Sequence, residues 1–136
     1  KPDLFQLLYR MSIVNLNLGF ESKAIDLYKK ILKKNSNHSY SLNNLAWLYL
    51  TSENKQLRNT SAALTLSKLA VEYEFSIDNI DTLAEAYFQM GDREKAIETL
   101  RNGSRKAFFL KEREKYLRLQ FLRFKKGEII SKPPPL

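Results

Sequence analysis

One stretch of the sequence, residues 77–107, has the apolar pattern of two helices joined by a tight turn. Apolar and small residues recur at helical spacing on either side of Gly91-Asp92, at Leu83, Ala84, Tyr87, Ala96, Leu100 and Gly103. The small residues, such as Ala84 and Ala96, stand where the two helices would cross, which is typical of close packing. A hairpin of this kind cannot bury both of its sides alone, so its presence predicts further copies.

The same pattern occurs in two earlier parts of the chain. Copies begin at Phe5, Ser39 and Ile77, so that the first step is 34 residues and the second is 38 residues. The extra length lies mainly between Thr51 and Ser61, where we expect a longer turn that tucks Leu57 inward. The spacing predicts three hairpins, at about 5–38, 39–76 and 77–110, stacked within a single domain of residues 1–136.

The repeated pattern resembles the tetratricopeptide repeat, whose consensus places an aromatic, Leu-Gly, Tyr, Ala, Phe and Pro at fixed positions over 34 residues. The resemblance covers residues 5–107 and is most specific in the third copy. Three departures are visible: the final Pro is absent from every copy, Asn15 replaces Tyr, and the first aromatic is replaced by Leu8, Leu42 and Ile80. The resemblance implies an all-α fold, a right-handed superhelical stack of antiparallel helix pairs with a C-terminal capping helix, about seven helices in all.

The residue types present argue against catalysis and against metal or cofactor binding. The chain has no Cys and one histidine, His38, which we expect in a loop. Asp78, Asp81 and Glu85 share a helical face, but no activated nucleophile accompanies them. The longest apolar run, residues 45–50, is far shorter than the roughly 18 residues of a membrane span. Because the sequence begins with Lys rather than Met, we expect it to be a piece of a longer protein.

The positive charge of the chain is concentrated at its C-terminal end. Residues 1–100 hold 12 basic and 12 acidic residues, whereas residues 101–136 hold 11 and 3, which accounts for the whole net charge of +8. The C-terminal segment, with a helix expected at about 111–126, carries one apolar stripe to cap the third repeat, namely Leu110, Leu117, Phe121 and Phe124. A second stripe, Tyr116, Leu119 and Leu122, predicts self-association or docking to another domain. Residues 131–136 form a Pro-rich tail or linker.

The resemblance also implies a binding surface. In this family the first helix of each pair lines a concave groove that binds a peptide or helix of a partner protein. The corresponding residues are Tyr9, Ile13, Tyr40, Asn43, Asn44, Trp47, Asp78, Asp81, Glu85 and Phe88. This groove would be aromatic at one end and acidic at the other, so we expect a partner with an apolar anchor and basic residues. The alternatives are a core position for Trp47 and a solvated acidic face without a ligand.

The sequence also bears on two other classes of ligand, the C-terminal carboxylate of chaperones and nucleic acid. Family members that clamp the C-terminal carboxylate of chaperones use Lys, Asn and Arg, but here only Asn44 matches and Asp78 replaces a cation, which excludes that class of ligand. The basic residues near the C-terminus predict an alternative, binding to nucleic acid or an anionic surface. These residues are Arg105, Lys106, Lys111, Arg113, Lys115, Arg118, Arg123, Lys125 and Lys126.

Overall fold

The computed structural model describes residues 3–106 and 114–127, except for the side chains of residues 114–117. Within these residues the chain forms seven α-helices and one 3-10 turn, and no strand is present. The helices are α1 (Leu4–Asn17), α2 (Glu21–Lys34), α3 (Ser39–Thr51), α4 (Thr60–Tyr73), α5 (Ile77–Gln89), α6 (Arg93–Lys106) and α7 (Glu114–Lys126), with the 3-10 turn η1 (Lys55–Leu57) between α3 and α4. The predicted all-α class is therefore confirmed.

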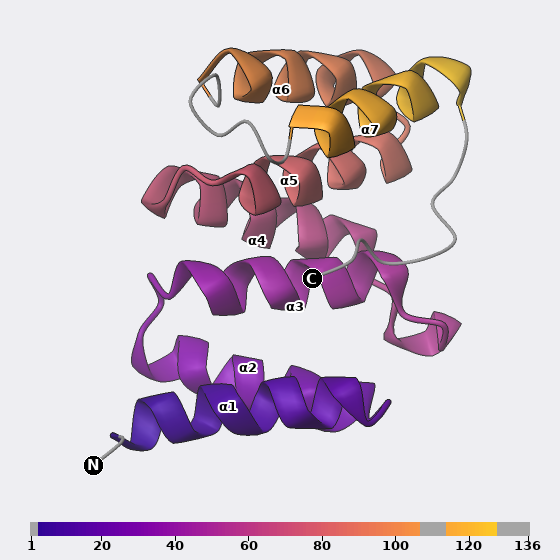
Figure 1. Ribbon diagram of the computed structural model, residues 1–136. Helices are drawn as coiled ribbons and strands as arrows, with labels where there is room; N and C mark the ends of the chain where they lie inside the picture. Colours follow the sequence, from indigo (N-terminus) through magenta and orange to yellow (C-terminus); the bar gives the residue numbers. More distant parts are fainter. Residues whose placement is uncertain (1–2, 107–113, 128–136) are drawn as a thin grey trace.

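The helices pack as successive pairs that form a stack (Figure 1). Helices α1 and α2, α3 and α4, and α5 and α6 pack together, and α2 contacts α3 as α4 contacts α5. Helix α3 also contacts α5, so the first helices of neighbouring pairs touch directly. Helix α7 packs on α6 and touches α5 at the end of the stack opposite α1. This arrangement is that of a helical repeat protein.

Local chemistry accounts for where several helices begin and turn. The residues before α1, α3, α4 and α5 accept a hydrogen bond from a backbone N–H in the first turn through their side chains, which satisfies a donor that the helix leaves free. These caps are Asp3, His38, Asn59 and Ser76. Gly19 and Gly91 link the two helices of their hairpins with φ angles of 79° and 88°, a conformation that favours glycine.

The lengthened connection in the second hairpin is ordered by a short helical turn and two side chains. Asn54 caps η1 by accepting a hydrogen bond from the Gln56 N–H. Leu57 is half-buried against the apolar cluster formed by α1, α2 and α3, as the sequence predicts. The insertion is therefore a self-packed turn.

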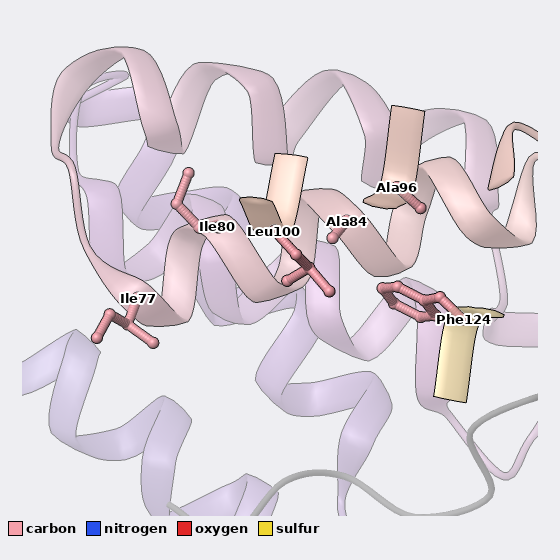
Figure 2. Close-up of a cluster of buried hydrophobic side chains, with 6 residues drawn as sticks. All are labelled: Ile77, Ile80, Ala84, Ala96, Leu100 and Phe124. Carbon is pink, nitrogen blue, oxygen red and sulfur yellow. The ribbon is translucent and has the colours of Figure 1, made fainter. Parts of the chain in front are cut away.

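The core beneath α7 shows why small residues recur at the helix crossings (Figure 2). Ala84 and Ala96 are fully buried where α5 meets α6, and Ile77, Ile80 and Leu100 surround them. Gly103 is also buried, and a Cβ added to it would lie 2.4 Å from Cγ2 of Ile80. The two helices approach closely because these positions carry almost no side chain.

Helix α7 covers the apolar end of the third pair. Phe124 is fully buried in the cluster of α5 and α6, and its ring stacks on Phe88 with centroids 4.8 Å apart. Phe121 is half-buried against the same cluster. The side chains of Leu110 and Leu117, which belong to the same predicted stripe, lie outside the described residues, as does the tail at 131–136.

None of the helices in the described ranges combines the length and apolar character needed to cross a membrane.

Candidate functional site

The residues predicted to line a groove divide into exposed, half-buried and buried groups. Tyr40 and Asp78 are exposed, Tyr40 by 60% of its surface. The half-buried residues are Tyr9, Ile13, Asn43, Asn44, Trp47 and Phe88. Asp81 and Glu85 are only 3% and 1% exposed. The surface open to a ligand therefore belongs mainly to α1 and α3, which lie in front of α2 and α4 in Figure 1.

An aromatic cluster joins α1 to the beginning of α3. The His38 ring lies 5.0 Å from the Phe5 ring and 5.3 Å from the Tyr9 ring, both in edge-to-face geometry. The Tyr40 ring lies 6.0 Å from His38 and 6.2 Å from Tyr9. Aromatic side chains arranged this way offer a rigid apolar surface with polar edges. We call Phe5, Tyr9, His38 and Tyr40 the aromatic cluster.

His38 has a structural role that the sequence analysis missed. The Nδ1 atom of His38 accepts a hydrogen bond from the Ser41 N–H at 3.2 Å, which caps α3. Burial lowers the pKa of His38 below its ordinary value of 6.5, and the Glu74 carboxylate opposes this change. The position directly before a predicted helix could have indicated a cap, although Ser, Thr, Asp and Asn are the usual residues there.

An amide below the aromatic cluster connects three helices. The Asn44 Nδ2 atom donates to the Tyr28 hydroxyl at 3.2 Å and lies 3.4 Å from the Tyr9 hydroxyl. Burial raises the pKa of both tyrosines above the ordinary value of 10.0, and their bonds to Asn44 oppose it. Both phenols are therefore neutral acceptors at pH 7, and they hold Asn44 in place from α1 and α2.

Two polar atoms on α3 have no partner among the described residues. The Trp47 Nε1 donor and the Asn43 Oδ1 acceptor are buried and make no hydrogen bond. The two residues are four positions apart, so they lie on the same helical face one turn from each other. Trp47 is half-buried, which places it between the two alternatives of a groove residue and a core residue. A buried polar atom without a partner is costly, which makes this face of α3 a candidate for binding.

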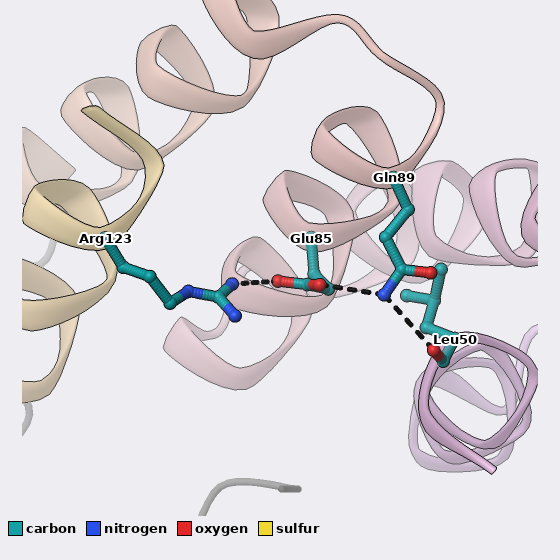
Figure 3. A network of polar contacts seen from close by, with 4 residues as sticks. All are labelled: Leu50, Glu85, Gln89 and Arg123. Atoms are coloured by element: carbon teal, nitrogen blue, oxygen red, sulfur yellow. Dashed lines mark hydrogen bonds and ion pairs between the residues drawn. The ribbon is translucent and has the colours of Figure 1, made fainter. Parts of the chain in front are cut away.

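The predicted acidic end of the groove is corrected by the structure. Arg123 of α7 forms an ion pair with Glu85, and the Gln89 Nε2 atom donates to Glu85 at 2.8 Å and to the Leu50 carbonyl at 3.1 Å (Figure 3). These contacts run from α7 across α5 to α3. The charge of Glu85 is therefore compensated inside the protein by Arg123 of α7, and Asp81 is also buried. The two carboxylates present no open acidic surface.

The predicted basic surface is corrected in one respect. Arg123 is turned inward toward Glu85 and is only 14% exposed, so it does not belong to that surface. Arg105, Lys106, Arg118, Lys125 and Lys126 are exposed. Lys106 and Lys125 each lie over an aromatic ring, at 5.6 Å from Phe75 and 4.6 Å from Phe121. Lys111 and Arg113, and the side chain of Lys115, lie outside the described residues.

The described residues form a stack of helix pairs, and most of the candidate residues that are exposed or half-buried lie on the first helices α1 and α3. The family pattern of the tetratricopeptide repeat matches residues 27–65, from the middle of α2 through α3 into α4. This match supports the resemblance to the tetratricopeptide repeat family that the repeated pattern predicts. Such repeats generally mediate protein–protein interaction and are typically non-catalytic. No curated protein matches the chain significantly.

The cap at His38 predicts a pH dependence of stability. The folded state disfavours protonation of His38, so the unfolded state binds the extra proton and the free energy of unfolding falls below about pH 6.5. We expect a loss of about 0.5–1 kcal/mol between pH 7.5 and pH 5.5, since protonation also removes the acceptor of the cap. The His38→Asn variant keeps a capping oxygen and should lack this loss. Urea unfolding at several pH values measures the difference, and parallel curves for both proteins would contradict the prediction.

Proposed function

We propose that the chain is a non-enzymatic interaction module that binds a segment of a partner protein on the face formed by α1 and α3. The observation that carries the proposal is the aromatic cluster, with Tyr40 exposed, beside two unused hydrogen-bonding atoms on α3. In this module residues 1–136 are one domain, made of three repeats at about 5–38, 39–76 and 77–110 and a C-terminal helix.

The aromatic cluster suits an apolar or aromatic anchor of the partner. Tyr40 and Tyr9 come from different helices and their tilted rings lie 6.2 Å apart, so a side chain packed on both rings would touch two elements at once. The cap at His38 and the neighbouring bond of Asn44 hold the surrounding rings in place. Rigid, partly buried aromatic side chains are the residues that most often dominate binding energies.

Asn43 and Trp47 suit the backbone of an extended peptide. An extended chain presents carbonyl and N–H groups, which can pair with the Trp47 donor and the Asn43 acceptor once binding moves the side chains that now cover these two atoms. Pairing these two atoms would remove the cost of leaving them unsatisfied. Asp81 and Glu85 are buried, so basic residues of a partner could not pair with them. The proposed partner is therefore recognised by its apolar anchor.

Selection from a peptide library displayed on phage, followed by calorimetric titration of the selected peptides, tests the proposal. We expect a Tyr40→Ala variant to bind at least about tenfold more weakly than the native chain. Tyr73→Ala is the matched control, because Tyr73 is exposed on α4 in the other helix layer. Peptides that lose affinity for the Tyr73 variant and not for the Tyr40 variant would overturn the proposed site.

A further inference from the structure

The last turns of α3, α5 and α7 lie close together at one edge of the stack. Arg123, in the last turn of α7, pairs with Glu85 of α5. Gln89, the last residue of α5, donates a hydrogen bond to the Leu50 carbonyl in the last turn of α3 (Figure 3). A segment that follows α7 therefore starts beside the ends of α5 and α3.

Residues 128–136 follow α7 and are long enough to reach α3. Packed neighbouring helices lie about 8–10 Å apart, so α3 is roughly 20 Å from α7 with α5 between them. The nine residues from 128 to 136 lie outside the described residues, and a chain of that length spans up to about 30 Å. Residues 131–136, which we call the Pro-rich segment, contain three consecutive prolines, and this composition favours the polyproline II conformation.

On α3, Trp47 and Asn43 hold a donor and an acceptor that a proline-rich chain can pair. The Trp47 Nε1 and Asn43 Oδ1 atoms are buried and have no hydrogen-bond partner among the described residues. Proline carbonyls accept hydrogen bonds, and Leu136 supplies the first N–H after the three prolines. Docking must displace the side chains that now cover the two atoms, and the two new hydrogen bonds compensate for that movement.

The spacing on α3 also matches a polyproline II helix. Trp47 and Asn43 are four residues apart, which is about 6 Å along the axis of α3. Two residues of a polyproline II helix rise by about 6 Å as well, so a proline carbonyl bound to Trp47 leaves the Leu136 N–H within reach of Asn43. Tyr40 lies one turn further toward the beginning of α3 and is 60% exposed, so it offers the Leu136 side chain an apolar surface. Surfaces lined by aromatic side chains are typical binding sites for proline-rich segments.

We propose that the Pro-rich segment docks on α3 of its own chain and occupies the binding face proposed above until a partner displaces it. The inference rests on the proposed function and names its ligand class, a proline-rich segment in the polyproline II conformation. A segment tethered by so few residues is present at an effective concentration in the millimolar range, so even weak docking keeps the face occupied. The partner segment must therefore compete with the protein's own prolines.

The single tryptophan of the chain allows docking to be measured without a partner. Trp47 contributes one indole N–H resonance to the nitrogen–proton NMR spectrum of the full chain. A hydrogen bond from Nε1 to a proline carbonyl moves this resonance downfield. We expect an upfield shift in a Pro133→Ala, Pro134→Ala, Pro135→Ala variant, because alanine lacks both the stiffness and the apolar ring of proline.

Matched controls separate docking from a general effect on the protein. A Pro2→Ala variant changes the only proline outside the Pro-rich segment and should leave the Trp47 resonance in place. A synthetic peptide of residues 131–136 at millimolar concentration should restore the downfield position in the triple variant, but it should not affect the native chain, whose face is occupied. Circular dichroism shows whether the triple variant folds. If it does not, a Leu136→Glu variant, which puts a charge at the apolar anchor, should give a shift in the same direction.

Two results of this experiment would overturn the inference. An identical Trp47 resonance in the native chain and the folded variants would show that Nε1 is not paired with the Pro-rich segment. A shift that the peptide does not reverse would show that the prolines act on Trp47 indirectly.

Failure of the inference can be told apart from failure of the proposed function. Library peptides that need Tyr40, together with a Trp47 resonance that ignores the prolines, would remove the inference alone. A resonance that follows the prolines, without any library peptide that binds, would remove the proposed partner site alone. If both hold, the triple variant should bind the selected peptides at least about tenfold more tightly than the native chain, and equal affinities would show that the segment does not compete.

Discussion

Replacement of Arg123 by methionine is expected to lower the free energy of unfolding by about 3 kcal/mol. The substitution keeps most of the apolar stem but removes the cation that faces Glu85, which is only 1% exposed. A buried carboxylate that loses its ion-pair partner retains the full cost of having left water. The hydrogen bond from Gln89 would remain, but a neutral donor compensates less than a guanidinium does.

The matched control removes both charges at once. In an Arg123→Met, Glu85→Leu double variant no uncompensated charge is left, so most of the lost stability should return. Urea unfolding of the native chain, the two single variants and the double variant completes a double-mutant cycle. Hydrogen exchange of α7 adds a local measurement, because Arg123 and the buried Phe124 belong to that helix. A single-variant loss below about 1 kcal/mol would show that the pair does not hold α7 on α5.

Replacement of Gly103 by alanine is expected to destabilise the protein by about 1–2 kcal/mol, although alanine is the better helix former. The new Cβ would lie 2.4 Å from Cγ2 of Ile80, a distance that side chains cannot tolerate without movement. Ile80 is branched at Cβ and buried in the core, so it has few alternative rotamers. The overpacking cost of about 1–3 kcal/mol therefore exceeds the gain of about 1 kcal/mol in helix propensity.

The sign of this effect should reverse when Ile80 is removed. An Ile80→Ala variant alone is expected to lose about 2–5 kcal/mol through the cavity that it creates. In that background Gly103→Ala no longer meets Cγ2, and it should be neutral or stabilising by up to about 1 kcal/mol. Chemical unfolding of all four proteins measures the change of sign. A Gly103→Ala substitution that costs the same in both backgrounds would contradict the proposed contact.

Helix positions and their pairing follow from local signals in the sequence. Apolar residues at helical spacing, Gly19 and Gly91 at the turns, and Asp3, Asn59 and Ser76 before helices act within a few residues of the chain. Repetition of that pattern near a 34-residue period indicates stacked pairs, since a lone hairpin cannot bury its faces. For this reason the all-α stack and its resemblance to tetratricopeptide repeats were predictable, including the inward position of Leu57.

The aromatic end of the candidate site was predictable, but the acidic end was not. Tyr9, Tyr40 and Asn44 lie on first helices as the repeat implies, and neighbouring pairs bring them together. Asp81 and Glu85 also lie on a first helix, yet both are buried, and Glu85 pairs with Arg123 of α7. Arg123 follows Glu85 by 38 residues, and no helical periodicity links positions at that distance.

Tertiary packing was therefore needed to assign each apolar or charged stripe to the inside or the outside. The stripe of Leu4, Leu7, Met11, Val14 and Leu18 and the core-facing residues of α1 have equally apolar patterns, and only the position of α2 and α3 shows which one is buried. Phe124 and Leu122 on α7 differ in the same way. The physical reason is that helix formation depends on neighbouring residues, whereas burial depends on which surfaces meet after the helices have formed.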